Sequence, residues 1–203
     1  MNDQTIADAS KTIVDLLKAE LTDIAGQIAL ASPKTPGSNV LTIFLYKVLE
    51  NPCLRNEDRR IGTPDITGRV IEQPSPLTLD LYYLLTAHPL NGQVPNLFEA
   101  HRALSRAMRV LHEHGILRGS RLHSDTGQGF TKDSVLRVTF NPISMEDMTR
   151  IWSVFPDTPY EISVTYLVTP VEIELTAPAA TAPVVDQIHD QGHLDSRLVT
   201  AGA

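Results

Sequence analysis

Cysteine is almost absent from this chain of 203 residues, since Cys53 is the only one. One cysteine cannot form an internal disulfide, and it cannot build a structural zinc site of several thiolates. We expect Cys53, which follows the end of a predicted strand, to be packed rather than reactive. No apolar run is long enough to predict a membrane-spanning helix, so we expect no insertion into a membrane. The opening MNDQTIADAS is unlike a signal peptide, and we expect synthesis in the cytoplasm.

Basic charge is also scarce. The chain has 17 Lys and Arg against 24 Asp and Glu, which gives a net charge of -7 and a pI of about 5.4. An acidic chain is poorly suited to bind the phosphate groups of nucleic acids, so we expect no nucleic-acid partner. Aromatic residues make up only 5%, but hydrophobic residues make up 42%, which is enough for one well-packed domain. We expect that domain over residues 1–176, and a flexible C-terminal tail over residues 177–203, where the sequence is small, polar and aperiodic.

The strongest signal that is present is LTLDLYYLLTA, residues 77–87. Its side chains alternate between two faces, and both faces carry large apolar residues. A strand of this kind lies inside a sheet with helices or strands packed on both sides. Asp80 falls on the mixed face, where a carboxylate needs a partner, and we expect an arginine such as Arg102 or Arg109 to pair with it.

Other segments predict an α/β (α+β) fold with a mixed, mostly antiparallel sheet flanked by helices. Helical spacing covers residues 3–21, 97–114 and 144–155. Extended patterns cover residues 24–31, 40–49, 135–140 and 160–175, with a short piece from residue 116. Gly26 is expected at a bulge in the first of these strands. The apolar phase of the last strand switches at Thr169-Pro170, which predicts a bulge or bend there.

Two features leave alternatives open. Residues 54–73 are polar and charge-rich, as in a mobile loop or in an arm that becomes ordered on a partner. Helix 97–114 carries Arg102, Arg106 and Arg109 along one side. This stripe could contact an acidic partner surface, or it could be the solvated face of the helix.

The residues that often carry catalysis form no convincing site. His112 and His114 lie two positions apart, so on a helix their side chains point away from each other and do not chelate one metal ion easily. Gly127 and Gly129 lack the preceding strand and following helix that phosphate binding needs. We therefore predict no catalytic, cofactor or metal site, and we read the histidines as surface or boundary residues.

Five segments in a fixed order resemble a known family. They are FLYKVLENPCLRN (44–56), PLTLDLYYLLTAH (76–88), AHRALSRAMRVLHEHGIL (100–117), MTRIWSVF (148–155) and PYEISVTYLVTPVEI (159–173). Together they resemble the N-terminal domain of the cap, or tail-terminator, protein of extracellular contractile injection systems, which are phage-tail-like particles. The resemblance covers roughly residues 5–175 of this chain.

The resemblance implies a structural role. Proteins of that family form a six-fold ring on the last layer of tube and sheath and end polymerisation there. It implies a homo-hexamer, sheath and inner-tube proteins as partners, and a place in a particle that is released from the cell. A tail-completion protein of a contractile phage is one alternative, and a small metal-dependent enzyme using the histidines is another.

The family assigns no active-site residues, so the contact residues are hypotheses from charge and position alone. We expect arginines of one copy to face glutamates of the next copy or of a partner. The candidates are Arg55, Arg59, Arg60, Arg102, Arg106, Arg109, Glu172 and Glu174.

Overall fold

The structure, a computed structural model, describes residues 4–55, 71–72, 75–89, 97–123, 130, 134–174 and 180–181. The chain divides into two compact units, one of Met1–Asp58 with Ser75–Thr176 and one of Arg59–Pro74 with Ala177–Ala203. In the second unit, β3 (Ile71–Glu72) pairs antiparallel with β8 (Ala180–Thr181). This pair brings the end of the polar segment 54–73 beside the start of the C-terminal tail. The flexibility of that tail stays a prediction.

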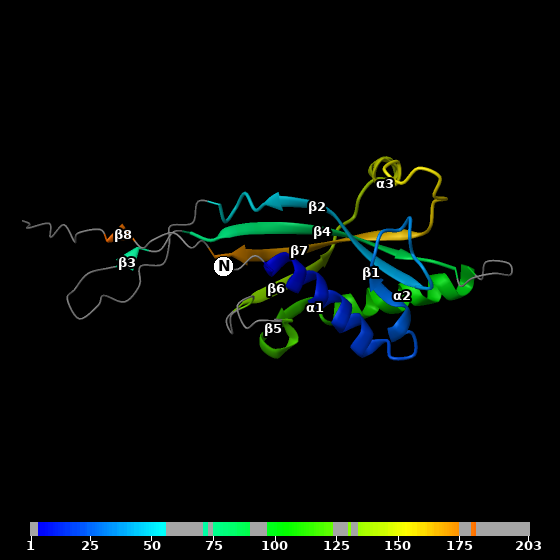
Figure 1. Cartoon of the computed structure of the whole chain (residues 1–203), viewed down its shortest axis with the longest axis horizontal. Coiled ribbons are helices and arrows are strands. Elements are labelled where there is room, and N and C mark those ends of the chain that lie inside the picture. The colour runs from blue at the N-terminus through cyan, green and yellow to red at the C-terminus, as the bar shows by residue number, and fades with distance from the viewer. Residues whose placement is uncertain are drawn as a thin grey trace, which may run out of the picture. The chain divides into compact units, whose positions relative to one another are not determined.

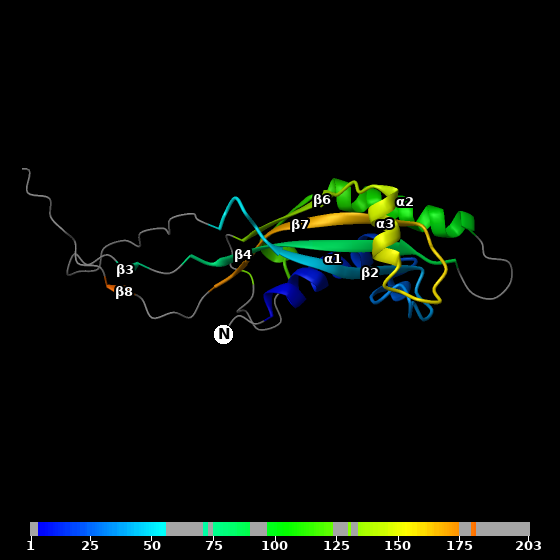
Figure 2. The ribbon, with the colours of Figure 1, turned by 90° about the horizontal axis from the view of Figure 1, so that it is seen from above.

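The first unit is built on a six-stranded sheet with the order β1-β2-β4-β7-β6-β5. Only β1 and β2 run parallel, and every other neighbouring pair is antiparallel. The predicted mixed, mostly antiparallel sheet is therefore confirmed (Figure 2). The strands are β1 (Ile28–Leu30), β2 (Leu41–Glu50), β4 (Leu77–Ala87), β5 (Ile116–Arg118), β6 (Val135–Phe140) and β7 (Ser163–Ile173).

Helices cover both faces of this sheet. Figure 1 shows α1 (Thr5–Glu20) and α2 (Leu97–Glu113) on one side, and α3 (Met145–Trp152) on the other. The larger core cluster joins α1 and α2 to the sheet through residues such as Leu17, Leu104 and Leu81. A smaller cluster on the opposite face joins Met148, Trp152 and Phe155 to Leu84.

Strand β4 has the predicted boundaries and the predicted burial on both faces. It lies between β2 and β7, and these three strands form the longest ladders of the sheet. Leu81, Tyr83 and Leu85 enter the larger core, whereas Leu84 enters the smaller one. The alternation of apolar residues in the sequence is thus the cause of the layered architecture.

Irregularities in register appear on both sides of β4. Val171 pairs with Leu79 while Val168 pairs with Leu81, so β7 carries an extra residue at the predicted position, Thr169-Pro170. A second irregularity in β2, between Leu45 and Lys47, was not predicted. One extra residue in a strand moves every later side chain to the other face. The side chains at the end of β2 therefore lie on the opposite faces from those that simple alternation along residues 40–49 predicted.

Two predicted strands and one predicted helix are shorter than expected. The strand predicted over residues 160–175 is observed as Ser163–Ile173. Residues 24–31 contain a 3-10 helix, Ala25–Gln27, before the three residues of β1. Gly26 therefore lies in that helix, not at a strand bulge, since the chain must turn after α1 before it can enter the sheet. Helix α3 ends at Trp152 because the backbone N–H of Phe155 donates to the Trp152 carbonyl at 3.0 Å, which tightens the last turn.

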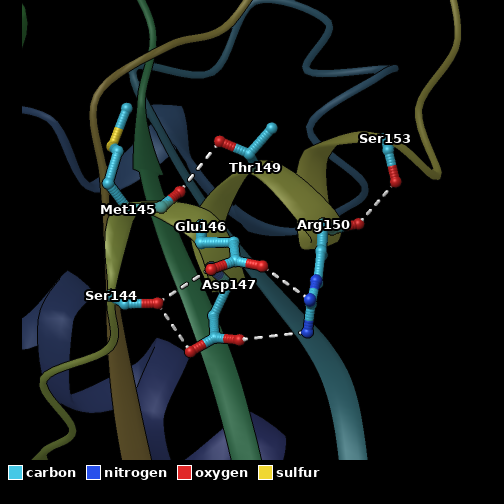
Figure 3. A network of polar contacts seen from close by, with 7 residues as sticks. All are labelled: Ser144, Met145, Glu146, Asp147, Thr149, Arg150 and Ser153. Carbon is cyan, nitrogen blue, oxygen red and sulfur yellow. Dashed lines mark hydrogen bonds and ion pairs between the residues drawn. The ribbon is translucent and has the colours of Figure 1, made fainter.

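The start of α3 shows how local sequence sets a boundary (Figure 3). Ser144 caps the helix, and its hydroxyl accepts the backbone N–H of Asp147 at 3.0 Å, as the sequence predicts. Glu146 one turn before Arg150 adds an ion pair of 2.6 Å on the exposed side. The cap and the acidic first turn fix α3 where its apolar side can cover Leu84.

Candidate interaction surface

The arginine stripe of α2 divides into two kinds of residue. Arg102 lies 3.8 Å from Glu99, and Arg109 lies 3.9 Å from Glu113. In both pairs the side chains are well exposed and the distance between the charged atoms is long. The ion pairs therefore stabilise the helix little and leave the guanidinium groups accessible. Arg102 and Arg109 remain predicted partner contacts.

Arg106 has a different environment. Its two terminal nitrogens donate to the two carboxylate oxygens of Asp23 at 2.7 and 2.5 Å. The hydrogen bonds from this guanidinium hold the pKa of Asp23 below its ordinary value, and the pKa of Arg106 is raised in return. A bidentate pair of this kind ties α2 to the segment after α1. Arg106 is thus already engaged within the chain.

Asp80 pairs with no arginine among the described residues, so the predicted pairing with Arg102 or Arg109 is wrong. Its Oδ1 atom accepts hydrogen bonds from Asn51 Nδ2 at 2.9 Å and from Thr169 Oγ1 at 2.5 Å. The helix arginines lie on an exposed surface, whereas Asp80 is buried among strands. Neutral donors from β7 and from the residue after β2 satisfy the carboxylate instead.

The other predicted contacts are exposed or lie beyond what the structure describes. Arg55 is 3.7 Å from Glu50, and both side chains are exposed. Arg59 and Arg60 lie outside the described residues. Glu172 and Glu174, at the end of β7, are exposed. None of the four predicted arginines that the structure describes, Arg55, Arg102, Arg106 and Arg109, forms an ion pair with these two glutamates.

Two histidines contact acidic residues of α1. His114, directly after α2, has Nε2 3.2 Å from Glu20, and His123, which follows β5, has Nδ1 2.9 Å from Asp15. His88 was not predicted as a notable residue, but it is buried, with Nε2 2.7 Å from Thr42 Oγ1 and Nδ1 in contact with Glu161. Burial lowers the pKa of His88 to about 4. The only signal for it was its position directly after the central strand.

Cys53 is exposed, so the prediction that it is packed is wrong. Asn51 Oδ1 accepts the backbone N–H groups of Cys53 and Leu54 at 2.9 and 3.1 Å, and this turn directs the thiol outward. Within the described residues, no group of three or more His, Cys, Asp or Glu side chains could hold a metal ion. No helix in the described ranges is long and apolar enough to cross a membrane.

A groove lies where the C-terminal half of α2 meets β5 and β6. Its volume is about 730 Å³. Residues of both layers line it, including Met108 of α2 with Val138 and Phe140 of β6, and Phe140 is 48% exposed. The basic residues Arg109 and His112 of α2 also line it. The combination of apolar walls and positive charge suits an acidic, apolar protein segment.

The groove runs along an incomplete sheet edge. β5 pairs only with Val135–Arg137, and the backbone N–H of Val138 then donates to the Gly115 carbonyl at 2.9 Å. Beyond that point, no described strand pairs with Phe140 on its β5 side. An edge that ends in this way is open to added backbone contacts.

The sequence profile of the Pvc16 N-terminal domain matches residues 8–187. This chain belongs to that family. The comparison with curated proteins gives no match.

Two solved structures share the fold of this Pvc16 N-terminal domain. One is the PVC sheath/tube terminator of an extracellular contractile injection system in its extended state, with a TM-score of 0.58 and 22% identity over 92% of this chain and 65% of that one. The other is the anti-feeding prophage cap, a tube terminating cap, with a TM-score of 0.58 and 19% identity over 93% of this chain and 62% of that one. The present chain therefore spans less than two thirds of the length of either protein.

Proposed function

We infer that this chain is the terminating cap of the tube and sheath of a contractile injection system. The observation that carries this proposal is the family match over residues 8–187. The two solved structures with the same fold are described as a sheath/tube terminator and a tube terminating cap, which supports it. The role is structural, with no substrate turned over. Neither alternative, a phage tail-completion protein or a metal-dependent enzyme, is favoured by these relatives.

A terminator must fit the last layer of a polymer on one face and refuse another layer on the other. Open strand edges suit the first requirement, because they offer free backbone groups to an adjoining subunit. Both edge strands, β1 and β5, are three residues long, so the rest of β2 and of β6 has no described neighbour on that side. The net charge of -7 suits the second requirement, because exposed surfaces of like charge repel each other.

The cap works as a ring of identical copies, and a homo-hexamer matches the six-fold ring implied by the sequence resemblance. Contacts between different surfaces of identical subunits close into rings when the rotation permits. Its partners in the particle are the sheath and inner-tube proteins. The particle leaves the producing cell, and the chain leaves as a component of it.

Polymer length tests this function. Tube and sheath proteins of the producing cell are assembled with and without the purified chain, and the polymers are measured by negative-stain electron microscopy. We expect the chain to shorten the polymers in proportion to its concentration and to add density at one end. Unchanged lengths and bare ends at saturating chain would contradict the proposal.

A further inference from the structure

Two exposed features lie at opposite ends of α2. At its start, Phe98 is 85% exposed and Leu97 is 55% exposed. At its other end lies the groove described above. Single exposed apolar side chains are common on protein surfaces, so Phe98 alone would mean little. The pairing of an apolar projection with an apolar groove on the same helix is the informative observation.

The two features are complementary in chemistry. Aromatic side chains are the usual anchors of protein interfaces, and a groove lined by Met108, Phe140 and Tyr166 offers an apolar site for one. Glu99 follows Phe98 directly. Arg109 lines the groove, and because its ion pair with Glu113 is exposed and long, at 3.9 Å, its guanidinium group is accessible.

The projection cannot reach the groove of its own chain. Phe98 and Met108 lie on one continuous helix, and ten residues of helix separate them by about 15 Å along its axis. A rigid helix cannot fold back over that distance, so the two features can meet only between copies. A contact that joins two different surfaces is heterologous, and it continues around a ring or along a filament.

We propose that the start of α2 of one copy, Leu97 and Phe98, occupies the groove between α2, β5 and β6 of the next copy. Glu99 then faces Arg109 across the contact. This proposal rests on the proposed function in one respect, because a cap ring needs a head-to-tail contact. It identifies the surfaces that make the contact.

Cysteine cross-linking tests the contact even when it is short-lived. Cys53 is the only cysteine and is exposed, so Cys53→Ser provides a clean background. In it, Leu97→Cys and His112→Cys place one thiol next to Phe98 and one in the groove, and leave Phe98 and Phe140 intact. The two proteins are mixed in equal amounts with oxidised glutathione.

We expect disulfide-linked heterodimers from the mixture. Adding Phe98→Asp to the Leu97→Cys chain, or Phe140→Asp to the His112→Cys chain, should lower the cross-linking rate at least tenfold. The matched control is Val154→Cys, whose position is 66% exposed, mixed with His112→Cys. It should cross-link no faster than the variants with an added aspartate.

Circular dichroism and thermal unfolding establish that every variant is folded. If folded Leu97→Cys and His112→Cys cross-linked at the same rate as the Val154→Cys control, the proposal would be overturned, as it would be by a rate insensitive to Phe98→Asp. Polymer length is measured separately with the unmodified chain. Capping without the cross-link would leave the proposed function standing and remove this contact, and a cross-link without capping would do the reverse.

Discussion

At the scale of single residues, Tyr83 shows how a buried polar group is held. Its side chain is 2% exposed, and its hydroxyl lies 2.8 Å from Ser10 Oγ on α1. Burial raises the pKa of Tyr83 to about 12. An ordinary tyrosine ionises near pH 10, so over the interval between these values the unfolded chain releases a proton that the folded chain keeps.

Tyr83→Phe is predicted to lower the free energy of unfolding at neutral pH by about 1 kcal/mol, the usual value of a lost hydrogen bond. Between about pH 10 and pH 12, ionisation of this tyrosine should lower the free energy of unfolding of the wild-type chain by up to about 3 kcal/mol. The variant lacks the ionisable hydroxyl, so its free energy of unfolding should fall by that much less. Urea unfolding across this range measures both effects. Tyr160→Phe, at a position that is 51% exposed, is the control and should reproduce the wild-type dependence.

The correction at Asp80 leads to a second prediction at this scale. Thr169→Val removes one of the two hydrogen-bond donors to the buried carboxylate and should cost about 1–3 kcal/mol of unfolding free energy. Arg109→Ala should change it by less than about 0.5 kcal/mol, because that side chain is exposed. If the arginine variant proved the more damaging, the assignment of partners to Asp80 would be wrong.

Residue partners were the least predictable feature from sequence. The need of Asp80 for a partner follows from its place in an apolar strand, but Asn51 and Thr169 are 29 and 89 positions away. Only the strand register brings them together. Arg106 is the reverse case, since spacing cannot distinguish it from Arg102 and Arg109, yet it alone of the three reaches Asp23.

At the scale of elements, α3 covers the second face of the sheet. Two methionines of this helix form a matched pair, because Met148 is 7% exposed and Met145 is 67% exposed. Met148→Ala should lower the unfolding free energy by about 2–4 kcal/mol, since it leaves a cavity beside Trp152. Met145→Ala should change it by less than about 0.5 kcal/mol. Chemical denaturation followed by Trp152 fluorescence gives both values, and equal effects would contradict the packing described here.

The link between α2 and the segment after α1 gives a further prediction. Arg106→Met removes the cation that holds the pKa of Asp23 low, so that pKa should rise towards its ordinary value, as measured by NMR titration of the carboxyl carbon. Because the paired carboxylate stabilises the fold above the ordinary pKa, wild type should lose more stability than the variant as the pH falls below about 4. If the substitution left the pKa of Asp23 unchanged, the ion pair between Arg106 and Asp23 would be ruled out.

The same pair determines how ring contacts should be tested. Arg106→Glu would place two carboxylates together inside one chain, so a smaller hexamer fraction would have two explanations. Arg102→Glu is the cleaner variant, because that side chain is 70% exposed. Native mass spectrometry of Arg102→Glu tests the predicted contact and leaves the hydrogen bonds between Arg106 and Asp23 in place.

The positions of helices and strands were the feature most predictable from sequence. β4 was placed to the residue, because Pro76 and Pro89 bound an alternating run. The N-terminus of α3 was located by its capping serine. The irregularity in β2 was missed because both faces of that strand are apolar, so a slip by one residue leaves no trace in the pattern. The groove was missed because it forms between elements that are distant in sequence.

At the scale of the whole molecule, the proposed function is that this chain fits the end of a polymer. The layered unit supplies a rigid body, with one core on each face of the sheet. Its exposed charged and apolar features lie at the ends of elements, where another copy or a partner can reach them. Family membership and fold supply the expectation of a cap, and sequence alone pointed to the same family through its ordered motifs.

The position of the chain in assembled particles tests this account most directly. Particles isolated from the producing cell are labelled with an antibody against the chain and imaged by cryo-electron microscopy. We predict label at one end of each particle only, over a closed ring on the last layer of tube and sheath. Label spread along the sheath, or particles that end without this chain, would contradict the account.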